Sequence, residues 1–155
     1  MTGKFHKFFL IILFFLITNC GFKVVKQSEI INFNIANIST LGDNRIGYRI
    51  KNKLLPYSKN QKKDPIFLEL EIKKNKSIRE KSKSNEVTKY QINIEIVVKY
   101  GNNSNERFSV SNTGVYNVST QHSFTLTNEK KLIKLLSDDL AEEIINGLVQ
   151  RFNDI

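Results

Sequence analysis

The residue with the clearest chemical assignment is Cys20, the one cysteine in a chain of 155 residues. It follows a basic start, which contains Lys4 and Lys7, and an uninterrupted apolar run of about ten residues at 8–17. Such a run has the length of an export signal and falls short of the roughly 20 residues of a membrane-spanning helix. A thiol directly after it, in Leu16-Ile17-Thr18-Asn19-Cys20, is typical of a bacterial lipobox. We therefore predict a signal peptide over residues 1–19 and a lipid covalently attached to Cys20.

Asn19 departs from this motif, because the residue before a lipidated cysteine is usually Gly, Ala or Ser. Two alternatives stay open: an ordinary signal peptide followed by a buried free cysteine, and an uncleaved membrane anchor. A lone cysteine cannot form an internal disulfide bond, so acylation is the expected use of the thiol.

Few other residues could do chemistry. After the signal the chain has one histidine, His122, followed by Ser123. Adjacency in sequence is not triad geometry, and with one histidine and no further cysteine most zinc sites and cysteine nucleophiles are excluded. Four acidic residues could bridge a cation, although a solvated helix face is the simpler interpretation: Asp138, Asp139, Glu142 and Glu143. We expect no enzymatic activity, no metal, and no cofactor beyond the lipid on Cys20.

A run of positive charge in the middle of the chain is a candidate binding site for phosphate groups. Lysine binds phosphate as a point charge, and salt weakens each contact. The alternative is that these lysines protect an edge strand or loop from aggregation. The candidate residues are Lys74, Lys76, Arg79, Lys81 and Lys83.

The overall charge also favours an anionic partner. The formal net charge is +9. Lys4 and Lys7 carry two of these charges and no acidic residue precedes Cys20, which leaves +7 for residues 20–155. Lipid phosphates or an acidic protein face would suit this charge, and a genome that favours Lys and Asn is the alternative cause. Export and the lack of a basic motif interleaved with aromatic residues argue against nucleic acid.

Hydrophobic periodicity predicts six elements that would position these residues. We expect strands at 31–35, 65–73, 90–100 and 107–116, a helix at 44–55 capped by Asp43 and ended by Pro56, and a helix at 129–152 capped by Thr127. Residues 74–86 indicate a hairpin loop into which the preceding strand could continue. The alternation slips near Thr113-Gly114, which predicts a β-bulge.

The order β-α-β-β-β-α predicts an α+β fold, a two-layer sandwich in which a mostly antiparallel four-stranded sheet carries two helices on one face. The last helix would pack on the sheet through an apolar stripe, although that stripe could instead contact a partner or a membrane surface. Residues 20–30 would form a lipidated tether, and 31–155 a single domain. The stripe consists of Leu132, Leu136, Leu140, Ile144, Leu148 and Phe152.

Taken together, these features resemble the LPS-assembly lipoprotein LptE family in its alphaproteobacterial form. The resemblance spans nearly all of the chain after the signal and depends on the combination of short motifs. These are Cys20-Gly21-Phe22, Arg45-Ile46-Gly47-Tyr48 through Leu54-Leu55, Phe67-Leu68-Glu69-Leu70, the strand from Tyr90 to Tyr100, and Tyr116 before the final crossing and helix.

The resemblance implies a non-enzymatic subunit of the lipopolysaccharide translocon. Such a protein is lipid-anchored at the periplasmic face of the outer membrane, plugs and helps to assemble an LptD-like β-barrel, and contacts lipopolysaccharide. The basic residues at 74–83 would then meet lipid A phosphates or acidic residues of the barrel lumen. Gly21 agrees with the outer membrane, since Asp at that position would signal retention in the inner membrane. Two alternatives remain: an auxiliary lipoprotein of another envelope lipid-trafficking complex, and an envelope enzyme that acts through His122.

Overall fold

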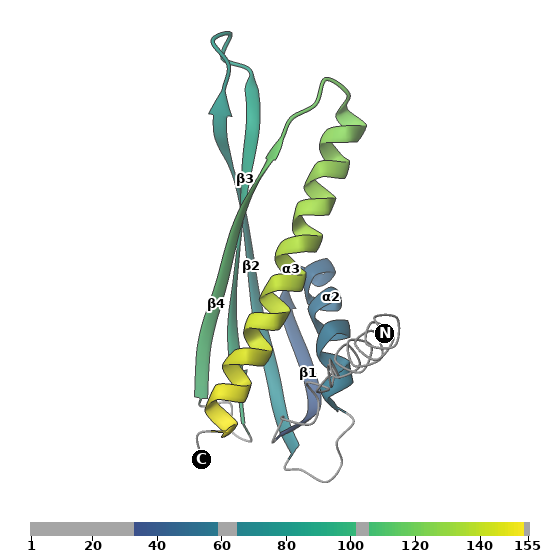
Figure 1. Cartoon of the computed structure of the whole chain (residues 1–155), viewed down its shortest axis with the longest axis vertical. Coiled ribbons are helices and arrows are strands. Elements are labelled where there is room, and N and C mark those ends of the chain that lie inside the picture. Colours follow the sequence, from purple (N-terminus) through teal and green to yellow (C-terminus); the bar gives the residue numbers. More distant parts are fainter. Residues whose placement is uncertain (1–32, 59–64, 102–105, 154–155) are drawn as a thin grey trace, which may run out of the picture. The chain divides into compact units, whose positions relative to one another are not determined.

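The computed structural model describes residues 33–58, 65–101 and 106–153. The elements are, in order, β1 (Asn34–Gly42), α2 (Asn44–Leu54), the 3₁₀ helix η2 (Leu55–Ser58), β2 (Pro65–Lys81), β3 (Val87–Tyr100), β4 (Glu106–Asn117) and α3 (His122–Asn153). They form a four-stranded sheet in the order β1-β2-β3-β4, in which β1 runs parallel to β2 and the other pairs are antiparallel (Figure 1). The predicted fold class and element order are confirmed.

The core lies between one face of the sheet and the two helices. Alternate residues of β3, from Ile92 to Val98, are fully buried, as expected for a strand with one face against the core. The helices contribute stripes with helical spacing, Ile46, Ile50 and Leu54 from α2 and Leu136, Leu140, Ile144 and Leu148 from α3. These side chains belong to a single hydrophobic cluster, and both helices lie on the same face of the sheet (Figure 1).

Two strands differ from their predicted extents. The first strand was expected at 31–35, but β1 runs from Asn34 to Gly42, with an irregular register between Ile35 and Asn37; residues 31 and 32 lie outside the described ranges. The segment 74–86 is a strand over most of its length, because β2 pairs with β3 as far as Lys81 opposite Val87. The strand therefore continues into this segment, as the sequence allowed, and the loop is confined to the tight turn 82–86, where Glu86 O accepts a 2.8 Å hydrogen bond from Ser82 N.

The bulge predicted near Thr113-Gly114 is also wrong. Strands β3 and β4 pair without a register shift from Lys89 opposite Asn117 to Tyr100 opposite Glu106. Gly114 faces α3, and a Cβ added there would lie 2.5 Å from Leu132 Cδ1. The apolar alternation is thus interrupted because glycine leaves room for the Leu132 side chain of α3. The strand contains no extra residue of the kind that forms a bulge.

The helix boundaries follow the predictions at one helix and depart from them at the other. Asp43 caps α2 as predicted, accepting hydrogen bonds from the backbone N–H groups of Arg45 (3.1 Å) and Ile46 (3.2 Å). The last helix begins at His122, earlier than the predicted 129. Thr127 is not its cap, since the Thr127 hydroxyl donates to Ser123 O within the helix at 2.9 Å. Within the described ranges, no helix is long and apolar enough to cross a membrane.

Gly42, the last residue of β1, lies very close to the backbone of β2, and a substitution tests this contact. Its φ of 102° is left-handed, and a Cβ would lie 2.0 Å from Ile72 O. We expect Gly42→Ala to lower the free energy of unfolding by about 3 kcal/mol, since backbone strain and a clash combine. Gly101→Ala is the control, because its φ is 95° with nothing within 4 Å and its cost should be about 1 kcal/mol. Equal losses in urea unfolding would show that the approach to Ile72 is not the constraint.

Candidate functional site

Cys20 and the predicted signal and tether lie outside the described residues, so lipidation stays a prediction.

The structure separates the five predicted basic residues into two groups. Lys74, Lys76, Arg79 and Lys81 lie in the second half of β2, and Lys83 lies in the turn that follows it. Among the described residues no element pairs with this half of β2 on its outer side, because β1 ends with Gly42 opposite Ile72.

Lys74 and Lys76 point toward the helices and are paired there. Alternate residues of β2 face the helix layer, beginning with the buried Ile66, Leu68, Leu70 and Ile72. Lys74 Nζ lies 2.5 Å from Asp43 Oδ2 at the start of α2, and Lys76 Nζ lies 2.6 Å from Glu129 Oε2 in α3. Both charges are balanced within the fold, which makes these two lysines poor candidates for ligand binding.

Lys76 belongs to a network that joins β2, β4 and α3. Glu129 Oε2 also accepts a 2.7 Å hydrogen bond from the Tyr116 hydroxyl. Lys76 Nζ lies 4.4 Å from the centroid of the Tyr90 ring, which stacks on Tyr116 at 5.7 Å. Burial by itself would raise the pKa of Glu129, but the hydrogen bonds from Lys76 and Tyr116 outweigh burial and hold that pKa below its ordinary value. The network is a structural link between the layers.

Three basic residues remain available at the end of the β2–β3 hairpin. We call Arg79, Lys81 and Lys83 the hairpin tip. Lys81 Nζ donates to Asn85 Oδ1 at 2.9 Å, and among the described residues none forms an ion pair with Arg79 or Lys83. Strand β4 ends opposite Lys89, so the hairpin continues beyond it as two strands (Figure 1). The predicted phosphate site is therefore reduced to these three exposed residues.

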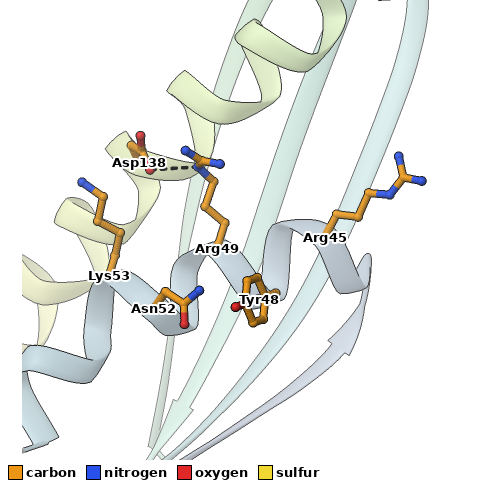
Figure 2. A pocket seen from close by; sticks show the side chains of 6 residues that line it. All are labelled: Arg45, Tyr48, Arg49, Asn52, Lys53 and Asp138. Atoms are coloured by element: carbon orange, nitrogen blue, oxygen red, sulfur yellow. Dashed lines mark hydrogen bonds and ion pairs between the residues drawn. The ribbon is translucent and has the colours of Figure 1, made fainter.

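A second basic site, which the sequence reasoning missed, lies between α2 and α3 (Figure 2). Two hollows of about 380 and 260 Å³ share Arg45 and Arg49 in their walls. We call this region the α2–α3 groove and define it by its charged residues, Arg45, Arg49, Lys53, Lys130, Lys134 and Asp138.

The groove carries far more positive than negative charge. Asp138 is the one carboxylate in the walls of these two hollows, and its Oδ1 lies 3.1 Å from Arg49 Nε. The cations of α2, Arg45, Arg49 and Lys53, recur at intervals of four in the sequence. Their position opposite Lys130 and Lys134 was not visible, because it depends on how the two helices pack.

The remaining candidates have separate surroundings. Asp138 pairs with Arg49, and Asp139 accepts a long 3.4 Å hydrogen bond from Asn112 Nδ2. Glu142 and Glu143 are exposed, and no group of acidic, histidine or cysteine residues in the described ranges could hold a metal ion. His122 is exposed at the first position of α3, and the described residues show no hydrogen bond between it and Ser123. The structure therefore brings no nucleophile and base together at this position.

The sheet face opposite the helices is polar. Glu95 pairs across the strands with Ser111, and Asn93 with Thr113, where Asn93 Nδ2 donates to Thr113 Oγ1 at 2.8 Å. On the same face Lys99 bridges β3 to β2 through Glu69, at 2.9 Å, and Glu71. Among the described residues no element covers this side, which we call the open face (Figure 1). Its positions are the odd-numbered residues of β2 from 67 to 77 and of β3 and β4 along their length.

The fold is shared with bacterial lipoproteins. No family model and no curated protein matches the chain. Rare lipoprotein B from Shewanella oneidensis superposes with a TM-score of 0.54 at 12% identity, over 76% of this chain and 97% of that one. A minor lipoprotein from Acinetobacter baumannii gives 0.56 at 14% identity, over 77% and 94%. Lipoprotein B from Nitrosomonas europaea gives 0.57 at 14% identity, over 80% and 87%. The described domain thus shares its fold with these lipoproteins.

The Glu129 network predicts a specific dependence of stability on pH. A carboxylate whose pKa is lowered by folding stabilises the protein above its unfolded pKa, here 4.5, and this contribution is lost as the pH falls through the folded value. We expect Glu129→Gln to lower the free energy of unfolding by about 1 kcal/mol at pH 7. The difference from wild type should shrink below pH 4.5. Glu142→Gln, on the exposed side of α3, is the control and should change urea unfolding little at either pH; a Glu129→Gln loss that is as large at pH 3 as at pH 7 would contradict the network.

Proposed function

We propose that this protein is an outer-membrane lipoprotein of the lipopolysaccharide translocon, anchored by a lipid on Cys20. In this proposal it plugs and helps to assemble a β-barrel partner similar to LptD, contacts lipopolysaccharide during its insertion, and acts without catalysis. The shared lipoprotein fold and the export signal ending at Cys20 support an envelope lipoprotein. The motifs from Cys20-Gly21-Phe22 to Tyr116 support the narrower assignment.

The observation that carries the barrel partnership is the open face. A sheet with helices on one side commonly leaves its other side in water, and that side is then polar. Here the open face combines paired polar groups with isolated apolar side chains, including Phe67 at 47% and Val115 at 44% exposure. A polar barrel lumen would suit this mixture, since interfaces of this kind combine hydrogen bonds with apolar contacts.

Photocrosslinking from the open face tests the partnership. Ser111 lies on this face opposite Glu95 and is exposed, so a photoreactive residue there should capture an outer-membrane β-barrel in intact cells. The matched position is Glu142 on the exposed side of α3, which should give a weaker crosslink to the same barrel. Mass spectrometry would identify the products. A crosslink from both positions to an inner-membrane ATPase complex would favour the auxiliary lipoprotein of another lipid-trafficking system.

The hairpin tip is the proposed contact for lipopolysaccharide phosphates. The variant Arg79→Gln/Lys81→Gln/Lys83→Gln should bind lipopolysaccharide about tenfold more weakly at low salt, because three phosphate contacts are lost. Its urea midpoint should not change, since the described structure gives these charges no carboxylate partner.

A control variant removes the same charge from other exposed positions, Lys73→Gln/Arg107→Gln/Lys131→Gln. It should bind nearly as well as wild type in surface plasmon resonance at several salt concentrations. Equal weakening by the two triple variants would mean that net charge, and not the hairpin tip, determines binding.

A further inference from the structure

The α2–α3 groove concentrates positive charge in a way that disfavours the fold by itself. Arg45, Arg49 and Lys53 are four residues apart on α2, so they share one helix face (Figure 2). Like charges at this spacing repel each other and destabilise a helix. Lys130 and Lys134 repeat the spacing on α3 and line the same hollow as Arg45 and Arg49. A bound anion would relieve this repulsion.

The groove also presents hydrogen-bond donors that the described residues do not use. Arg49 reaches Asp138 through Nε, and no described residue accepts from its two terminal nitrogens. Arg45 is exposed and forms no ion pair with a described residue. A guanidinium fork suits phosphate oxygens, because two parallel N–H groups can donate to one phosphate.

The floor of the groove contains apolar side chains among its charges. Ile133 lines the hollow between Arg45 and Lys130, and it also lines an adjoining hollow of about 130 Å³ that reaches Leu126. The other walls of the adjoining hollow are charged, and its two carboxylates are already paired, Asp43 with Lys74 and Glu129 with Lys76. Leu126 is 41% exposed. An inorganic anion would leave this floor in contact with water, whereas a ligand that joins a phosphate to a hydrocarbon chain would cover it.

We propose that the α2–α3 groove binds the phosphate head group of an anionic phospholipid, with the first methylene groups of one acyl chain along Ile133 and Leu126. Hollows of about 380, 260 and 130 Å³ have room for a head group and part of one chain, within the usual range of small-ligand sites. The site lies on the helix layer, so it is separate from the open face and from the hairpin tip. It concerns a different ligand and does not depend on the proposed barrel partner.

Native mass spectrometry of the full chain in a neutral detergent tests the proposal. With equal amounts of phosphatidylglycerol and phosphatidylcholine, we expect a saturable adduct of one phosphatidylglycerol, preferred about tenfold. Equal binding of both lipids would overturn the proposal. Inorganic phosphate that displaces the lipid at a similar concentration would also overturn it, because the acyl chain would then contribute nothing. A pentaglutamate peptide that binds as tightly as the lipid would instead assign the groove to an acidic protein segment.

Matched variants locate the binding. Arg45→Gln/Lys130→Gln should weaken the phosphatidylglycerol adduct about tenfold, since two charge-assisted contacts are lost. Lys131→Gln, at the exposed α3 position next to Lys130 but outside the groove, is the control and should leave the adduct unchanged; a loss as large as that of Arg45→Gln/Lys130→Gln would overturn the assignment. Neither variant should lower the urea midpoint, and both should keep the Ser111 crosslink to the barrel. Failure of lipid binding with that crosslink intact would reject the groove proposal alone, and the reverse result would reject the barrel partnership alone.

Discussion

The burial of one stripe of α3 against a single face of the sheet is the contact on which the rest of the structure depends. Leu140, Ile144 and Leu148 are fully buried in it, as are Ile94 and Ile96 of β3. Each such side chain contributes roughly 1.5–3 kcal/mol when it leaves water. Because α2 joins the same cluster, all the described apolar burial of the helices takes place on one side of the sheet. The other side carries polar residues and a few isolated apolar side chains, such as Phe67 and Val115.

This one-sidedness determines what each basic residue can do. A lysine on β2 that points toward the helices must find a carboxylate, because an unpaired charge in that partly buried layer is costly. Lys74 and Lys76 find Asp43 and Glu129 there. Lys99, which points the other way, forms its ion pairs with Glu69 and Glu71 along the open face. The direction of a side chain, more than its charge, separates structural lysines from those free to bind a ligand.

Periodicity in the sequence predicted the elements whose pattern is set by the core. The alternation from Tyr90 to Tyr100 located β3, and Asp43 located the start of α2, because both signals are local. The second half of β2 could not be predicted in the same way. Its residues after Ile72 alternate little, and they are a strand because the longer β3 supplies their backbone partners. Gly114 misled the prediction for a related reason, since the residue that fills its space, Leu132, comes from α3.

The candidate sites show the same limit of local information. A run of lysines is visible in any sequence, yet two of the five residues chosen from it are neutralised by partners 31 and 53 positions away. The α2–α3 groove, in contrast, cannot be recognised in the sequence. Its cations are scattered over two helices, and their number is unremarkable in a chain of net charge +9. Packing places them around one apolar floor with a single carboxylate in the walls of its two larger hollows. Charge that a fold collects without balancing it is better evidence for a ligand than charge that is merely contiguous in sequence, because folding can pair contiguous charges with carboxylates, as it does for Lys74 and Lys76.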